Sequence, residues 1–269
     1  MFISMIYYLE NVVYKGATMR FCWNNFTVPG NYELFERLTY GNIDPACQYI
    51  NLAIPRGKVD FPTLIWFHGG GMSEALCDSN PAVWDGTFAV AAVRYRLAPR
   101  AMPPAQYLDA AQAIAFVHKI IGKYYGNNRK LIVGGLSAGA NMAALSCFDK
   151  KYLEPYNLSY KDFMAFLLVS GQMTTHFYLK ELLKYPTANA IPVIDEYAPL
   201  YHLKADLPPI FLLAGENDIP GRKYENLLML DTLKAMGHKD CSIYIAPGAA
   251  HGENLVEADP ILEFIHRFI

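Results

Sequence analysis

A short glycine-flanked serine motif is the part of the sequence with the clearest chemical meaning: residues 135–139 read GLSAG. This G-x-S-x-G pattern follows an apolar run and precedes a run of small residues, which is the context of a nucleophile elbow. The backbone of such a turn is strained, and Gly135 and Gly139 remove side chains that would collide with the adjoining strand and helix. We therefore expect Ser137 to be a nucleophile.

A second motif, HGGG at residues 68–71, follows another apolar run. Its chance expectation in a chain of this composition is only about 0.002. Consecutive glycines leave N–H groups free to face a ligand, and such donors stabilise the negative oxygen that develops in acyl transfer. We expect an oxyanion hole formed by the N–H groups of Gly69, Gly70 and Ala138, the residue after the nucleophile. A flexible turn is the alternative, and His68 is expected to brace the loop through its ring nitrogens.

An acid and a base complete the set of candidate catalytic residues. Asp218 and His251 each follow an apolar run, and the carboxyl ends of parallel strands meet at one edge of a sheet. The order serine, acid, histidine is that of proteins with a nucleophile elbow. Histidine would take the serine proton, and the carboxylate would hold the imidazole tautomer. Glu216 is the main alternative acid, and Asp195 and Asp206 are weaker candidates.

The elements that must position these residues follow from hydrophobic patterning. Continuous apolar runs predict strands covered on both faces at residues 63–67, 88–95, 131–133, 163–169, 210–214 and 242–246. Helices are predicted at residues 105–125, 138–148, 222–236 and 258–269. Residues 48–54 alternate in polarity, which predicts a half-buried antiparallel strand. Because strand and helix alternate from residue 61 onward, we expect one α/β domain over residues 1–269, with a mostly parallel sheet and helices on both faces.

One long stretch, residues 172–207, interrupts this alternation. It contains three prolines and no strand-like run, so we expect short helices that form a small cap or lid over the active face. A structural excursion without a role is the alternative. Its tyrosines suit an aromatic or sugar-linked ligand, unless they simply face solvent; they are Tyr178, Tyr185, Tyr197 and Tyr201.

Composition excludes several other classes of protein. Hydrophobic residues make up 53% of the chain and charged residues 18%, which rules out a disordered protein. A net charge of −2 argues against a nucleic-acid partner, since proteins that bind nucleic acid are normally basic. Five scattered cysteines predict neither a disulfide scaffold nor a cysteine zinc site, and no motif indicates a metal or cofactor. No apolar run is long enough for a membrane span, and the poor signal-peptide pattern at the N-terminus favours the cytoplasm over a periplasmic or secreted location.

Taken with the segment YRLAP at residues 95–99, these motifs resemble the α/β-hydrolase superfamily, specifically hormone-sensitive-lipase-like and acetyl-xylan- or feruloyl-esterase-like bacterial carboxylesterases. The resemblance covers roughly residues 45–269. It implies an eight-stranded sheet, hydrolysis of short-chain carboxylic esters without a cofactor, and a structural Arg96 that pairs with Asp109. The chain departs from the family pattern near the expected pocket, at Met72, Leu136, Glu253 and Asn254.

The sequence thus favours a serine esterase that acts on small-molecule esters, and acetyl or feruloyl esters of carbohydrate are candidate substrates. An aryl-formamide or peptide amidase would use the same residues. A non-catalytic binding module of this fold is disfavoured because such proteins usually lose the serine or the histidine.

Overall fold

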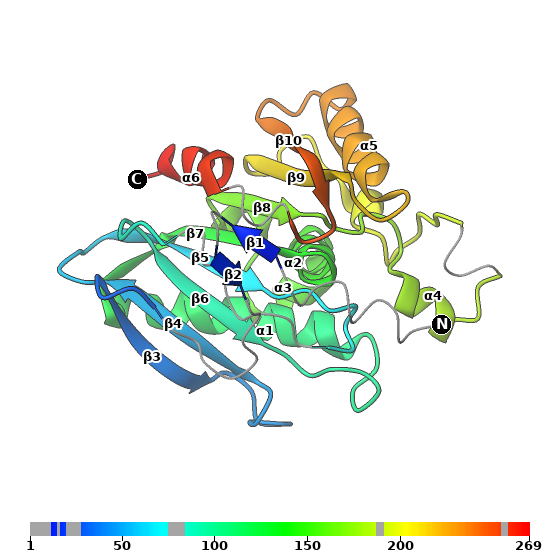
Figure 1. Cartoon of the computed structure of the whole chain (residues 1–269). Coiled ribbons are helices and arrows are strands. Elements are labelled where there is room, and N and C mark those ends of the chain that lie inside the picture. The colour runs from blue at the N-terminus through cyan, green and yellow to red at the C-terminus, as the bar shows by residue number, and fades with distance from the viewer. Residues whose placement is uncertain (1–11, 15–16, 20–27, 75–83, 187–190, 254–257) are drawn as a thin grey trace.

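The computed structural model describes residues 12–14, 17–19, 28–74, 84–186, 191–253 and 258–269. An eight-stranded sheet forms its centre, with the strands in the order β10-β9-β8-β7-β5-β6-β4-β3 (Figure 1). These strands are β3 (Tyr32–Thr39), β4 (Tyr49–Pro55), β5 (Phe61–Phe67), β6 (Ala89–Arg94), β7 (Gly126–Leu136), β8 (Ala165–Val169), β9 (Ile210–Asn217) and β10 (Cys241–Ala250). A separate antiparallel pair is formed by β1 (Val12–Tyr14) and β2 (Ala17–Met19).

The sheet is mixed and mostly parallel, as predicted. Every neighbouring pair from β6 through β5, β7, β8 and β9 to β10 is parallel. Only β4 runs against its two neighbours, β3 and β6. The parallel strands therefore bring their carboxyl ends to one edge, where the loops after β5, β7, β8, β9 and β10 meet.

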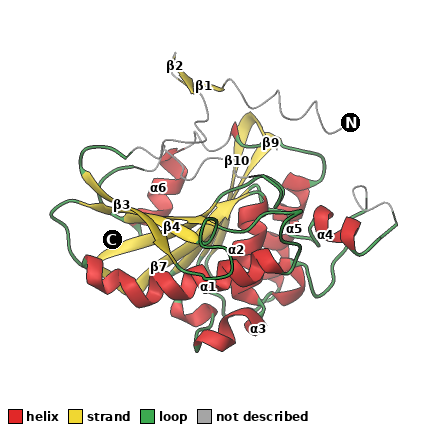
Figure 2. Ribbon diagram, turned by 90° about the horizontal axis from the view of Figure 1, so that it is seen from below, coloured by secondary structure: helices red, strands yellow, loops and turns green. Residues whose placement is uncertain are grey.

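Helices cover both faces of this sheet, which also confirms the prediction (Figure 2). They are α1 (Ala105–Ile120), α2 (Ala138–Phe148), α3 (Lys150–Leu153), α4 (Phe177–Leu182), α5 (Arg222–Ala235) and α6 (Ala258–His266). Side chains along β5 alternate between two cores: Ile65 and Phe67 pack with α1, α2 and α5, whereas Leu64 and Trp66 pack with α6. This period of two is what a strand buried on both faces requires.

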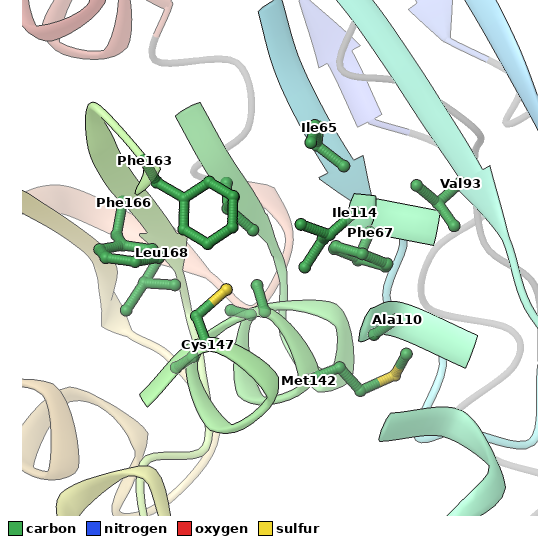
Figure 3. Close-up of a cluster of buried hydrophobic side chains, with 14 of the residues drawn as sticks. Ile65, Phe67, Val93, Ala110, Ile114, Met142, Cys147, Phe163, Phe166 and Leu168 are labelled. Atoms are coloured by element: carbon green, nitrogen blue, oxygen red, sulfur yellow. The ribbon is translucent and has the colours of Figure 1, made fainter. Parts of the chain in front are cut away.

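The larger core lies between the sheet and α1 and α2 (Figure 3). Every residue of α2 is buried. Its first turn is built from alanine, glycine and asparagine, and such small residues let a helix approach the strands closely. The prediction for this helix, residues 138–148, agrees with its observed bounds.

One prediction about burial was wrong. Strand β4 is antiparallel but not half-buried, because Asn51 and Ala53 are buried together with the apolar face. Asn51 tolerates burial because its Oδ1 accepts a hydrogen bond from Arg37 N, at a bulge in β3. On α1, Leu108 is 50% exposed, while Tyr107 and Gln106 are buried.

Strands β7, β9 and β10 extend beyond the apolar runs that predicted them. Strand β9 includes the exposed residues Glu216 and Asn217, and β10 continues to Ala250 after a register shift. Apolar runs mark only the buried centre of a strand, whereas backbone pairing with a neighbour carries the ladder further.

The excursion at residues 172–207 contains α4 and a 3₁₀ turn at Pro199–His202, on one flank of the molecule (Figure 1). It is held to the main domain by Glu225 of α5, whose Oε2 accepts hydrogen bonds from Met173 N, Thr174 N and Thr174 Oγ1 at 2.8–3.1 Å. Within it, Asp195 accepts bonds from Thr175 Oγ1 and Tyr185 Oη.

Two further features concern membrane spans and disulfides. In the described part of the chain, none of the helices has the length and apolarity needed to cross a membrane. Cys47, Cys147 and Cys241 are free thiols, and Cys22 and Cys77 lie outside the described residues.

Candidate active site

The nucleophile elbow connects β7 to α2. Ser137 has φ 54° and ψ −115°, a strained conformation for a residue with a side chain. Both flanking glycines are required by close packing: a Cβ on Gly139 would lie 2.1 Å from Phe67 O, and one on Gly135 would lie 2.6 Å from the carbonyl carbon of Gly139. The elbow is therefore pressed against the end of β5, which explains the spacing of the motif.

The structure brings the three candidate triad residues together from separate loops. His251 Nε2 lies 2.9 Å from Ser137 Oγ, and His251 Nδ1 lies 2.6 Å from Asp218 Oδ1. Ser137 follows β7, Asp218 follows β9, and His251 follows β10. The contact with Asp218 requires a proton on Nδ1, so Nε2 is left as an acceptor for the serine proton.

The acid is enclosed and fully hydrogen-bonded. Its side chain is 0% exposed, and it accepts bonds from Ile219 N at 2.8 Å, Gly215 N at 3.3 Å and Ser170 Oγ at 2.5 Å besides the contact with His251. Burial alone would raise the pKa of Asp218, but the bonds from His251, Ser170 and Ile219 outweigh it and hold that pKa below the ordinary value of 3.8. The carboxylate thus stays ionised at neutral pH.

The alternative acids lie elsewhere. Glu216 is exposed on β9, and its Oε2 accepts a hydrogen bond from Gly248 N at 2.8 Å. Asp195 is used inside the excursion, and Asp206 bonds Tyr160 Oη at the surface. None of these three carboxylates contacts His251 in the described structure.

The HGGG loop is braced by a buried histidine. His68 Nδ1 lies 2.7 Å from Gly69 O, and Tyr95 stacks on the imidazole and donates its hydroxyl to His68 O at 2.9 Å. Burial lowers the pKa of His68 from 6.5 to about 3, so the ring is neutral. Within the described part of the chain, only one ring nitrogen braces the loop, because Nε2 is buried and has no hydrogen-bond partner there. The expectation that both nitrogens do so was wrong.

The loop expected to form the oxyanion hole contacts the nucleophile elbow at Gly69. A Cβ on Gly69 would lie 3.3 Å from Ser137 Cβ, so this loop contacts the elbow directly. Gly70 has φ 111°, and a Cβ there would lie 2.0 Å from Glu74 O, so glycine is required. No residue that the structure describes accepts a hydrogen bond from the N–H groups of Gly69, Gly70 or Ala138. These donors remain available to a negative oxygen.

The sequence analysis missed two residues near the site. Ser170, the first residue after β8, contacts Asp218, and a polar residue at the end of an apolar strand was the signal that could have identified it. Arg222 is only 4% exposed, and its Nη1 has no hydrogen-bond partner. Burial lowers the pKa of Arg222, against the opposing influence of Glu225 and Asp218.

The excursion reaches the oxyanion loop through Phe177. The Cζ atom of Phe177 lies 3.2 Å from the position that a Cβ on Gly71 would take, and its ring packs on that of His176. Of the four tyrosines, Tyr201 is 61% exposed, and Tyr185 donates its hydroxyl to Asp195. Tyr201 therefore faces solvent, and the hydroxyl of Tyr185 has a structural role within the excursion.

Two of the residues that depart from the family pattern are buried. Met72 lies in the larger core, and Leu136 lies in the smaller one. Glu253 accepts a hydrogen bond from Ala250 N, and Asn254 lies outside the described residues.

The expected structural ion pair is present. Arg96 Nη2 lies 2.6 Å from Asp109 Oδ1, and Gln48 Nε2 donates to the same oxygen at 2.7 Å. This pair ties the segment after β6 to α1, away from the triad. The described residues contain no cluster of three or more metal-ligating side chains.

The chain is similar in sequence to curated carboxylic ester hydrolases. Carboxylic ester hydrolase LipN of Mycobacterium tuberculosis is 33% identical over 99 residues, which is 35% of this chain and 26% of LipN. Carboxylesterase NlhH of the same species is 28% identical over 198 residues, which is 70% of this chain and 54% of NlhH. The chain thus spans about half or less of the length of these relatives.

A solved structure shows the same fold. A truncated carbohydrate esterase from gut microbiota superposes with a TM-score of 0.74 over 89% of this chain and 98% of that one, at 14% identity. The BD-FAE family model matches residues 50–223. Because that match spans well over half of its 269 residues, the chain belongs to the BD-FAE family and has the α/β-hydrolase fold.

Proposed function

We propose that this chain is a serine hydrolase that cleaves carboxylic esters of short acyl chains through a covalent acyl-enzyme. The observation that carries the proposal is the continuous contact from Ser137 Oγ through His251 to Asp218, at 2.9 and 2.6 Å, beside backbone donors that lack an acceptor. Membership of the BD-FAE family and the ester hydrolases among its relatives support the same reaction.

In the first half-reaction, Ser137 Oγ attacks the ester carbonyl carbon while His251 Nε2 takes its proton. The carbonyl oxygen becomes negative and accepts hydrogen bonds from the N–H groups of Gly69, Gly70 and Ala138. Asp218 stabilises the imidazolium that forms. The C–O bond to the alcohol then breaks, and the alcohol leaves with the proton from His251.

In the second half-reaction, His251 takes a proton from water, and the resulting hydroxide attacks the acyl-enzyme. The same N–H groups stabilise the second tetrahedral intermediate, and Ser137 leaves with the proton from His251. No cofactor is needed, because every proton transfer is carried by side chains of this chain.

The size of the excursion favours short acyl groups. A long chain needs a deep apolar tunnel, and only the segment at residues 172–207 is available to build one. Each methylene contributes only about 0.8 kcal/mol when it is buried, so chains that the cleft cannot cover gain little. Acetyl or feruloyl esters of carbohydrate fit this reading, and a relative in the solved structures is a carbohydrate esterase.

The test is an acyl-ester panel. We expect the highest kcat/KM on p-nitrophenyl esters of about two to four carbons and a steep fall beyond about eight. Acetylated xylan and methyl ferulate test the carbohydrate reading, and N-formylkynurenine and a prolyl peptide test the amidase reading. A rise of kcat/KM to twelve carbons would contradict the short-chain proposal.

A second test replaces the proposed nucleophile, with another serine as the matched control. Ser137→Ala should reduce turnover by on the order of 10⁴-fold or more with the fold retained. Ser146→Ala, which removes a buried hydroxyl in α2, should keep it. If Ser137→Ala kept more than a tenth of the activity, the proposed mechanism would be wrong.

A further inference from the structure

The second carboxylate oxygen of the triad acid has a donor of its own. Ser170 Oγ lies 2.5 Å from Asp218 Oδ2, whereas the other neighbour of that oxygen, Gly215 N, lies at 3.3 Å. A distance of 2.5 Å is at the short end for a hydroxyl that donates to a carboxylate. Since the Asp218 side chain is fully buried, bulk water does not reach this oxygen to take the place of the hydroxyl.

The backbone of Ser170 is held in place for this contact. Its N–H donates to Leu213 O of β9 at 2.7 Å, immediately beyond the paired residues of β8 and β9. Its φ of 47° lies in the left-handed region, which is unfavourable for a residue with a Cβ. Glycine would adopt this conformation without strain. The backbone conformation alone therefore does not account for a serine at position 170.

We propose that Ser170 is a positioning residue for the triad acid. Its hydroxyl fixes the plane of the carboxylate so that Oδ1 faces His251 Nδ1, and it draws negative charge toward Oδ2, away from the imidazole. The inference rests on the proposed function, because it assigns Asp218 the role of the acid.

Loss of this hydroxyl has two expected consequences. Oδ2 of the carboxylate is then held only by the longer contact from Gly215 N, so the carboxylate and the imidazole are less well oriented and kcat falls. The remaining negative charge also acts more strongly on His251, which favours imidazolium and moves the acid limb of the kcat/KM profile to higher pH.

The test compares Ser170→Ala with Ser170→Gly. Both remove the hydroxyl, but only glycine relieves the backbone. We expect each to lower kcat about tenfold, the loss typical of one hydrogen bond to a charged group, with KM changed less than about twofold. We expect the acid limb to rise by about half a pH unit in both. If Ser170→Gly were as fast as the wild type, or if the acid limb did not move, the proposal would be overturned.

A double-mutant cycle separates a role through Asp218 from a general structural effect. If Ser170 acts through the acid, Ser170→Ala should cost less than about twofold in an Asp218→Asn background, so the losses are strongly non-additive. Losses that multiply would overturn the proposal. Ser146→Ala, whose buried Oγ donates to Tyr107 O instead, controls for the loss of a buried hydroxyl and should leave the pH profile unchanged.

Measuring Ser137→Ala beside Ser170→Ala distinguishes the failure of this inference from the failure of the proposed function. If Ser137→Ala remained active, the proposed function would fail whatever Ser170 did. If Ser137→Ala were inactive while Ser170→Ala matched the wild type, only the role of Ser170 would be refuted.

Discussion

Two buried histidines on either side of the site make the fold sensitive to mild acid. His68 lies under the oxyanion loop, and His176 lies at the base of the excursion. Burial lowers the pKa of each from 6.5 to about 3, and for His176 the positive charges of Arg222 and Lys180 contribute further. Both rings are therefore neutral in the folded chain between pH 5 and pH 7.

The magnitude and sign follow from proton linkage. Below pH 6.5 the unfolded chain binds protons on these two histidines and the folded chain does not, so stability falls as the pH drops, until the folded pKa of about 3 is reached. Between pH 7 and pH 5 each histidine removes about 2 kcal/mol, so the pair removes about 4 kcal/mol from the free energy of unfolding. Against the roughly 5–15 kcal/mol of a typical domain this is a large loss.

Urea unfolding followed by tryptophan fluorescence at pH 7 and pH 5 measures this difference. His176→Asn should roughly halve it. Leu179→Ala is the matched control: it removes a buried neighbour, so it should lower stability at both pH values by the same amount. A wild-type change below about 1 kcal/mol, or an equal change in His176→Asn, would refute the assignment of two neutral buried histidines.

Two further predictions concern the acid and the elbow. Asp218→Asn should lower kcat by about 10²–10⁴-fold, whereas Glu216→Gln should change it little, because only Asp218 contacts the imidazole of His251. Steady-state kinetics with the opposite ranking would move the acid to Glu216. Gly139→Ala should abolish cooperative thermal unfolding or turnover, since the new Cβ would lie 2.1 Å from Phe67 O. The Cβ of Gly122→Ala would meet no atom within 4 Å, so this control variant should stabilise the chain by about 0.4–1 kcal/mol. Equal melting temperatures for these two glycine variants would contradict the close packing of the elbow.

Local sequence determined the elements whose signal is contained in a few adjacent residues. The GLSAG and HGGG motifs define tight turns, and glycine at these positions is a steric requirement that any strand-turn-helix passage of this shape imposes. Helix α2 was predicted with its observed bounds because a run of small residues directly follows the serine motif. The centres of the strands could also be predicted, since strands that are buried on both faces have continuous apolar runs.

Choices that depend on partners distant in the sequence were decided by the tertiary structure. Asp218 and Glu216 stand two positions apart with similar chemistry, yet the end of β9 directs one toward His251 and leaves the other exposed. Asn51 on β4 is buried because a bulge in a neighbouring strand supplies a donor, which no local pattern records. Ser170 meets the acid across 48 residues of chain. Hydrophobic periodicity reports whether a side chain is buried, but hydrogen-bond partners across the sheet edge exist only once strand order and register have brought those loops together.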